Sequence, residues 1–313
     1  MRGLCLGVRC LGVICLGVLC LGWALAGQAS AACHVEHRAD IPVTLAGGQL
    51  LAAGRIDGQP VTFLIDTGAE RTVLSEAAVR RLGLARDEWV SSHMQGIGGA
   101  ERHPNAKLRT LELGGLALRR RGTEIAPSLA VAPLAFLGSS DRPIDGLLGV
   151  DYLANFDIAF DPGRGRMTLY GVAGCAGNFL PWTIPYTALA ARNPVPGLLL
   201  LTVWVNASPV LAQIDTGSTR SVLSLPAALR AGVTQAMLER DPQQQVRGAG
   251  ASEVTAYEHR FAELKIGPDD LHGMQVLVMK LPARGGGMLL GMDWLGARRL
   301  WISWATNQVF VGR

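Results

Sequence analysis

The sequence is poor in aromatic residues and in charge. Phe, Trp and Tyr make up only 6% of the 313 residues and Asp, Glu, Lys and Arg only 17%, while aliphatic residues and glycine are abundant. Such a composition is typical of a globular protein rather than a disordered one. The net charge is only +4, and the one dense basic run is Arg119–Arg121. Because nucleic-acid binding usually needs a clustered basic face, no nucleic-acid partner is expected.

The motifs of several common enzyme classes are also missing. Neither glycine-rich turn, Gly96–Gly99 or Gly248–Ala251, completes the Gly-x-Gly-x-x-Gly pattern of dinucleotide loops. His34 and His37 are spaced loosely like metal ligands but have no further ligands beside them. The remaining Asp and His residues form no recognisable Ser-His-Asp or Cys-His set. We therefore expect no metal ion and no organic cofactor.

Cysteine is concentrated in the first 31 residues, which contain four of the six. There an apolar run, Leu11–Ala26, follows two arginines and precedes the small residues Ala29–Ala31. This order is typical of a secretory signal peptide. We expect residues 1–31 to be removed, which leaves no stable membrane span and a periplasmic or secreted protein. A retained anchor and lipidation at Cys33 are the alternatives.

Two cysteines lie outside that segment, Cys33 and Cys175. In an oxidising compartment they can form one disulfide that ties the start of the remaining chain to its middle. The other possibility is a pair of free thiols. The sequence leaves both possibilities open.

Internal repetition is the most prominent feature that the sequence does have. The segment Ile65–Ser75 (IDTGAERTVLS) recurs as Ile214–Ser224 (IDTGSTRSVLS) with 8 of 11 residues identical. The segment Leu147–Leu153 (LLGVDYL) recurs as Leu289–Leu295 (LLGMDWL) with 5 of 7 identical. A glycine-rich turn and an alternating apolar run lie between the two motifs in each copy. The chain is therefore predicted to contain two copies of one structural unit.

Both copies have the sequence pattern of a mainly β fold. Short alternating apolar runs are broken by Gly, Pro and Asn, which is typical of strands. Short helix-like stretches follow the Asp loops at Glu76–Leu82 and Pro226–Ala231. We predict an all-β protein with an N-terminal lobe at residues 32–170 and a C-terminal lobe at residues 186–313. The Gly- and Pro-rich segment 171–185 is predicted to be the linker.

Each copy places one Asp on a tight glycine turn after an apolar strand. Asp66 and Asp215 lie at equivalent places in the two copies. If the lobes face each other, the two carboxyls form a dyad. Like charges held close cannot both ionise easily, so one pKa rises, the other falls, and the pair holds one proton. Such a pair offers both a base that can activate water and an acid.

The order of these motifs resembles that of the retropepsin-like aspartic proteases. The shared elements are Asp-Thr-Gly-Ala/Ser after an apolar strand, a glycine-rich turn about thirty residues later, and a Leu-Leu-Gly segment. Two fused copies resemble the bilobal plan of the pepsin-like enzymes, and the Leu-Leu-Gly-x-Asp-x-Leu form looks most like the bacterial group. The resemblance implies two tandem acid-protease β-barrel lobes related by a pseudo-twofold axis. The proton-sharing dyad is a known property of that family.

The resemblance also implies roles for the residues next to the two acids. Thr67 and Thr216 would bond across to the opposite loop and hold the acids face to face. Gly68 and Gly217 would let backbone amides come close to the carboxylates, because glycine has no side chain to prevent it.

The residue after each of these glycines differs between the copies. The hydroxyl of Ser218 could donate to Asp215, whereas Ala69 offers Asp66 no side-chain donor. We therefore expect Asp215 to ionise more readily and Asp66 to hold the proton more often.

The two glycine-rich turns resemble the flaps of these proteases. A flap must move and bring its backbone to the substrate, and glycine permits both. No Tyr stands beside either turn, so the Tyr-bearing flap of pepsin is not reproduced. The candidate flap residues are Gly96, Ile97, Gly98 and Gly99 in the first copy and Gly248, Ala249 and Gly250 in the second.

One feature departs from the retroviral members of the family. In those enzymes the Leu-Leu-Gly-like segment continues with an Arg that pairs with an acid just after the active loop. Val150 and Met292 occupy that position here. We expect the ion pair to be absent or rebuilt with Arg71 or Arg220.

The predicted function is that of an aspartic endopeptidase. Water activated by Asp66 and Asp215 would attack an extended polypeptide that binds as an added strand. The chain is expected to act as a monomer without a cofactor. One alternative is a catalytically inactive, protease-like peptide-binding protein. Another is pairing of each lobe with its counterpart in a second chain. Trp294, Trp301 and Trp304 are expected to pack in the core.

Overall fold

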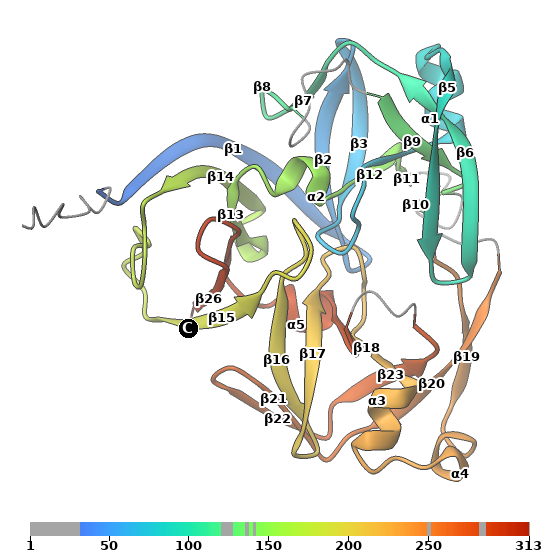
Figure 1. Cartoon of the computed structure of the whole chain (residues 1–313), viewed down its shortest axis with the longest axis vertical. Helices are drawn as coiled ribbons and strands as arrows, with labels where there is room; N and C mark the ends of the chain where they lie inside the picture. The colour runs from blue at the N-terminus through green and yellow to red at the C-terminus, as the bar shows by residue number, and fades with distance from the viewer. Residues whose placement is uncertain are drawn as a thin grey trace, which may run out of the picture. The chain divides into compact units, whose positions relative to one another are not determined.

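The computed structural model describes residues 32–119, 128–134, 138–139, 142–248, 252–281 and 286–312 (Figure 1). The expected signal segment at residues 1–31, Ala249 and Gly250 lie outside the described residues. Strands make up most of the described chain and the helices are short, so the predicted all-β fold is confirmed. Within the described part of the chain, no helix is long and apolar enough to cross a membrane.

The first half of the chain contributes most strands of the first lobe. Its elements are β1 (His34–Ala46), β2 (Gln49–Ile56), β3 (Gln59–Ile65), β4 (Val73–Ser75), α1 (Glu76–Leu82), β5 (Arg86–Gly96), β6 (Gly99–Lys107), β7 (Leu111–Leu113), β8 (Leu116–Ala117), β9 (Ser128–Ala132), β10 (Gly138–Ser139), β11 (Arg142–Pro143), β12 (Gly146–Leu148), α2 (Val150–Leu153), β13 (Asp157–Asp161), the 3₁₀ turn η1 (Pro162–Arg164) and β14 (Arg166–Ala173).

The second half repeats this order with few changes. Its elements are β15 (Tyr186–Arg192), β16 (Leu200–Val205), β17 (Ser208–Ile214), β18 (Val222–Ser224), α3 (Leu225–Arg230), α4 (Gln235–Leu238), β19 (Gln243–Val246), β20 (Val254–Arg260), β21 (Glu263–Ile266), β22 (Asp269–His272), β23 (Gln275–Met279), β24 (Met288–Leu290), α5 (Met292–Leu295), β25 (Leu300–Ser303) and β26 (Gln308–Gly312).

Each Asp loop follows a β-hairpin. In the first lobe β2 and β3 pair antiparallel through the turn Asp57-Gly58, whose φ angles are 49° and 79°. In the second lobe β16 and β17 pair through Asn206-Ala207, with φ angles of 44° and 63°. Positive φ at both central residues suits the twist of a two-residue hairpin, and Asp, Asn and Gly adopt it readily.

Both ends of each Asp loop are held by one further strand. In the first lobe β12 pairs in parallel with β3, which precedes the loop, and antiparallel with β4, which follows it. In the second lobe β24 does the same with β17 and β18. Because β12 and β24 carry the Leu-Leu-Gly motif, the two repeated motifs lie side by side in each lobe.

The helix after each loop begins at a serine. Ser75 and Ser224 accept hydrogen bonds from the backbone amides of Ala78 and Ala227, so they cap the first turns of α1 and α3. The first helix ends at Gly83 with φ at 64°. The helical stretches predicted from the sequence thus agree with the structure to within about one residue.

A sheet of six strands combines both halves of the chain. β1 pairs with β14, β14 with β13, β13 with β25, β25 with β26, and β26 with β15. The contact between the halves is β13 against β25, where Ile158 lies opposite Ile302. The sheet explains why residues 32–313 form one unit, although the segment between β14 and β15 has few regular elements.

Aromatic side chains cover this shared sheet, and a disulfide closes its edge. Trp301 is fully buried and stacks on Tyr170 with ring centroids 4.3 Å apart. Trp294 and Trp304 are also buried, as expected for core residues. A bridge between Cys33 and Cys175 joins the chain before β1 to the segment after β14. Of the two possibilities left open for these thiols, the structure shows the disulfide.

Candidate active site

The two Asp loops are joined by reciprocal hydrogen bonds between their threonines. The hydroxyl of Thr67 donates to the carbonyl oxygen of Ile214 over 2.9 Å, and that of Thr216 donates to the carbonyl oxygen of Ile65 over 2.7 Å. Each threonine amide donates to the other hydroxyl, at 3.0 and 3.1 Å. Both threonines are buried, at 5% and 2% exposed. The expected bonding across the loops is therefore present.

Each carboxyl accepts two amides of its own loop. The amides of Gly68 and Ala69 donate to Oδ1 of Asp66, both over 2.9 Å. The amides of Gly217 and Ser218 donate to Oδ1 of Asp215, both over 3.0 Å. Two amide donors on one oxygen stabilise the ionised form of each carboxyl.

The two carboxyls lie over each other's loops. A methyl group added at Gly68 would collide with the carboxyl of Asp215, and one added at Gly217 would collide with the carboxyl of Asp66. Glycine is therefore required at both positions for a steric reason, in addition to the approach of the amides. The structure thus brings together both predicted acids and the four predicted residues beside them.

Both acids have a raised pKa, chiefly because both are buried, so the expectation that one of the two pKa values falls is wrong. Burial, followed by repulsion from Asp215, raises the pKa of Asp66 to about 8. Burial raises the pKa of Asp215 to about 6, against the stabilising effect of its two amide hydrogen bonds. The acids titrate as a pair, so one proton is shared between them over this range.

The expected role of the Ser218 hydroxyl is wrong. This hydroxyl donates to the carbonyl oxygen of Arg220 over 2.7 Å, two residues further along the same loop, rather than to Asp215. Serine readily forms such local bonds to the backbone. The Ser218 amide donates to Asp215 just as the Ala69 amide donates to Asp66. The Ser218 side chain is therefore no source of inequality between the acids.

The two predicted flaps meet at their tips. Gly96–Gly99 form the turn of the hairpin β5–β6, where Gly98 and Gly99 have φ angles of 93° and 124°. The amide of Ser252, in the turn of the hairpin β19–β20, donates to the carbonyl oxygen of Gly98 over 2.9 Å. Gly248 packs against Ile97 so closely that an added Cβ would lie 2.6 Å from the Ile97 Cβ.

Apolar clusters connect the flaps with the Asp loops. In the first lobe, Ala69 of the loop and Met94 of the flap pack on a cluster that includes Leu64, Val73 and Leu147. The second lobe has an equivalent cluster, in which Val222 and Leu289 correspond to Val73 and Leu147. Ile97, at the tip of the first lobe's flap, packs against this second cluster.

A known protein family matches the chain in two regions, one in each lobe. The model of the aspartyl protease family matches residues 52–152 and 201–294, which is more than half of the chain. The chain belongs to the aspartyl protease family. Each matched region contains one Asp loop and one Leu-Leu-Gly segment, so both lobes of this aspartyl protease family member are recognised separately.

Three curated relatives carry the name "Protein DDI1 homolog 2". The protein from Danio rerio is 27% identical over 143 residues, which is 45% of this chain and 31% of the relative. The one from Xenopus tropicalis is 25% identical over 143 residues (45% and 32%), and the one from Homo sapiens is 25% identical over 129 residues (41% and 29%). The chain thus spans about a third of the length of these relatives.

A polar network that the sequence analysis missed explains the Asp of the Leu-Leu-Gly-x-Asp-x-Leu segment. Asp151 accepts hydrogen bonds from the amide and the hydroxyl of Thr72, both over 2.8 Å. The Thr72 hydroxyl in turn accepts the amide of Gly149 over 3.0 Å. The Asp therefore fixes the chain that leaves the first Asp loop.

The second lobe repeats this network with serine in place of threonine. Asp293 accepts the amide of Ser221 over 2.8 Å and its hydroxyl over 2.7 Å, and the amide of Gly291 donates to the same hydroxyl over 3.1 Å. The signal was in the sequence, because a hydroxyl residue and an Asp stand at the same places in both repeats.

The ion pair expected at Arg71 or Arg220 is rebuilt at Arg220. Its guanidinium contacts Glu258 of β20 over 2.6 Å, which ties the second Asp loop to the strand that leads from the flap. Among the described residues, Arg71 forms no ion pair. The two lobes therefore differ at this point.

A second missed residue is Gln213, two positions before Asp215. It is buried at 6% exposure, and its side-chain amide donates to the carbonyl oxygen of Gly68 over 2.9 Å. A polar residue in an otherwise apolar strand was the signal, since the first lobe has Leu64 at the equivalent place.

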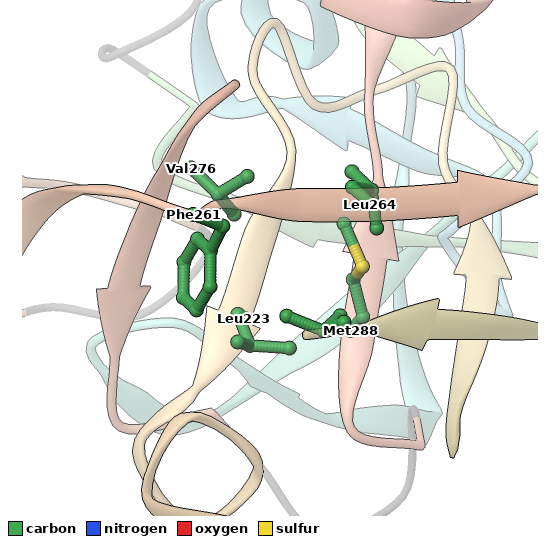
Figure 2. Close-up of a pocket in the computed structure, with 6 residues that line it drawn as sticks. Leu223, Phe261, Leu264, Val276 and Met288 are labelled. Atoms are coloured by element: carbon green, nitrogen blue, oxygen red, sulfur yellow. The ribbon is translucent and has the colours of Figure 1, made fainter. Parts of the chain in front are cut away.

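A gap in the core of the second lobe is a packing defect rather than a binding site. Figure 2 shows Leu223, Phe261, Leu264, Val276 and Met288 pointing toward one another around it. All its lining residues are apolar, and the gap is too narrow for a water molecule. It offers no polar group to orient a ligand.

Proposed function

We propose that this protein is an aspartic endopeptidase whose catalytic residues are Asp66 and Asp215. The observation that supports the proposal is the placement of two carboxyls against each other's loops, where burial raises both of their pKa values. In the singly protonated pair, the ionised carboxyl takes a proton from a water molecule. The water oxygen attacks the scissile carbonyl carbon while the other carboxyl donates its proton to the carbonyl oxygen.

The proposed substrate is an extended polypeptide. Two glycine-bearing hairpins meet at their tips, and extended backbone can pair with the edges of such hairpins as an added strand. The proposed flap residues are those given above, including Ala249 and Gly250 of the second turn.

We also propose that the protein acts as a monomer outside the cytoplasm. Both Asp loops come from one chain, so the site is complete without a second copy. The disulfide between Cys33 and Cys175 supports a signal-directed periplasmic or secreted location, because such bridges persist in oxidising compartments. The Leu-Leu-Gly-x-Asp-x-Leu segments support the likeness to bacterial retropepsin-like proteins.

Asn substitution of each acid tests the mechanism. Asp66→Asn and Asp215→Asn in the full chain are each expected to lower cleavage of a peptide library by at least about a thousandfold. Asp270→Asn, at an exposed position of β22, is the matched control and should cleave normally. Full cleavage by both active-loop variants would contradict the proposal. Tight peptide binding by the native chain without turnover at any pH would favour the peptide-binding alternative.

The raised pKa values of the two acids also make the stability of the fold depend on pH. The folded-state pKa of each acid lies above the ordinary value of 3.8. The folded state therefore binds the proton more tightly, and stability is lost as the pH rises through about 6 to 8. Removing one acid relieves this loss, so Asp215→Asn should melt at a higher temperature than the native chain at pH 8 and at a similar one at pH 4.

A further inference from the structure

The strands that lead to the two Asp loops differ at one buried position. Leu64 lies two residues before Asp66 and is 1% exposed within the apolar cluster of the first lobe. Gln213 lies two residues before Asp215 and is almost as buried. The duplicated units therefore place a side chain with a hydrogen-bond donor on one side of the dyad and a hydrocarbon on the other.

The contact of Gln213 accounts for a buried amide at this place. Burying an amide is unfavourable unless it is hydrogen-bonded. Its neighbours Ala212 and Ile214 point into the core, and because side chains alternate along a strand, Gln213 points the other way. There its Nε2 donates to the carbonyl oxygen of Gly68 over 2.9 Å. The bond crosses from the second lobe to the first Asp loop.

The bond acts on a peptide group that touches the dyad. The carbonyl of Gly68 and the amide of Ala69 belong to the same peptide, and this amide donates to Oδ1 of Asp66 over 2.9 Å. A donor on the carbonyl polarises the peptide and makes its N–H a stronger donor. The bond also fixes the plane of the peptide, and thereby the direction of the N–H.

The second loop lacks this support. The amide of Ser218 donates to Oδ1 of Asp215 over 3.0 Å, and the carbonyl of that peptide belongs to Gly217. The residue of the first lobe that matches Gln213 is Leu64, whose side chain cannot donate a hydrogen bond. The threonine bonds and the amide bonds to the carboxyls are paired between the lobes, whereas the bond of Gln213 is not.

We infer that Gln213 is a positioning residue, which holds the Gly68–Ala69 peptide against Asp66 and so supports one carboxyl of the proposed catalytic pair from the other lobe. The inference rests on the proposed function for its catalytic meaning. Its electrostatic consequence is that Gln213 favours the ionised form of Asp66 and so opposes the effect of burial on the pKa of this acid. The charged neighbour that raises the pKa of Asp66 is Asp215.

Gln213→Met tests the inference, since methionine has a similar length and no donor. Its kcat is expected to fall about tenfold with KM within about twofold, because the change acts on the reacting carboxyls and not on substrate contacts. The upper pKa of the pair, read by carboxyl carbon NMR and by the alkaline limb of the rate profile, should rise by about half a unit.

Gln213→Glu provides the rescue. A protonated Glu can donate to the Gly68 carbonyl, whereas an ionised Glu cannot and repels Asp66. This variant should match the native kcat on the acidic side of the profile and lose activity as the Glu ionises. The discriminating result is native kcat at acidic pH in this variant together with a lowered kcat in Gln213→Met at the same pH, because a role that only fills space predicts equal kcat values there. If Gln213→Met fails to fold, the profile of Gln213→Glu decides alone.

Leu64→Met is the matched control at the equivalent position of the first lobe. It alters packing but removes no donor, so kcat and the upper pKa should stay at native values. A native titration and kcat in Gln213→Met would overturn the inference. A native chain that cleaves nothing would contradict the proposed function separately, because the NMR titration still shows whether Gln213 acts on the pair.

Discussion

At the scale of single residues, the acids are defined by opposing effects on their ionised forms. Burial and the neighbouring carboxyl disfavour ionisation of Asp66, while the amides of Gly68 and Ala69 favour it. Asp215 experiences the same burial and two equivalent amides. The net result is a pair that holds one proton at a pH where isolated carboxyls hold none.

The first prediction concerns the pH dependence of cleavage. Only the singly protonated pair contains both a base and an acid, so kcat/KM should be bell-shaped, with limbs near pH 6 and pH 8. Below the lower limb both carboxyls are protonated, and above the upper limb both are ionised. Initial rates on one peptide across pH 4 to about 10 provide the measurement. A rate that is constant across this range would contradict a dyad mechanism.

At the scale of elements, the repeated motifs are pieces of one support. The Leu-Leu-Gly strand pairs with both ends of the Asp loop, and the Asp that follows it binds the residue after the loop. In the second lobe this residue is Ser221, which is fully buried. The strand β24 holds the two ends of the loop, and Asp293 holds the residue that follows it. The carboxyl of Asp215 takes no part in these contacts and faces the opposite lobe.

Asp293→Ala tests this support. The substitution leaves the amide and hydroxyl of Ser221 without their acceptor, so it should lower the free energy of unfolding by about 2–4 kcal/mol. It should also reduce cleavage, because the second Asp loop loses one of its anchors. Urea unfolding and peptide cleavage are the measurements. Asp270→Ala is the control, since this exposed acid pairs with Lys265 and His272 at the surface.

The contact between the two flap tips depends on an apolar side chain. Ile97 reaches from the first lobe into the apolar cluster of the second, so Ile97→Ala should weaken the contact between the tips. The amide of Ser252, which donates to Gly98, should then exchange with deuterium several-fold faster and KM should rise. Met94→Ala, in the cluster of the first lobe, should leave this amide unchanged. Native exchange in Ile97→Ala would show that the tips do not depend on Ile97.

The repetition in the sequence was sufficient to predict the two equivalent Asp loops and the bonds between them. Asp66 and Asp215 could be paired because their whole surroundings are duplicated, and the threonine bonds followed from the family pattern. The Ser218 hydroxyl was placed wrongly, because a local bond to Arg220 competes with the carboxyl and spacing cannot rank the two. Gln213 was overlooked because its partner is Gly68, which lies 145 residues away and in the other lobe.

At the scale of the whole molecule, the lobes are linked by more than the segment between them. The shared sheet brings β13 of the first half against β25 of the second. Asp157, at the start of β13, is 2% exposed and accepts the indole N–H of Trp301 over 3.0 Å and the amide of Ala305 over 3.3 Å. One buried carboxyl therefore holds the turn between β25 and β26.

Asp157→Ala should destabilise the whole unit because it leaves the Trp301 indole N–H buried without an acceptor. We expect the free energy of unfolding to fall by about 2–4 kcal/mol, in one transition for both lobes. Asp157→Asn retains an acceptor and removes the charge. Burial raises the pKa of Asp157, so the native chain loses stability as the pH rises through that pKa. Relative to the native chain, Asp157→Asn should therefore be more stable at pH 8 than at pH 4. Two separate unfolding transitions in the native chain, followed by fluorescence of Trp301 and by far-ultraviolet dichroism, would show that the sheet does not couple the lobes.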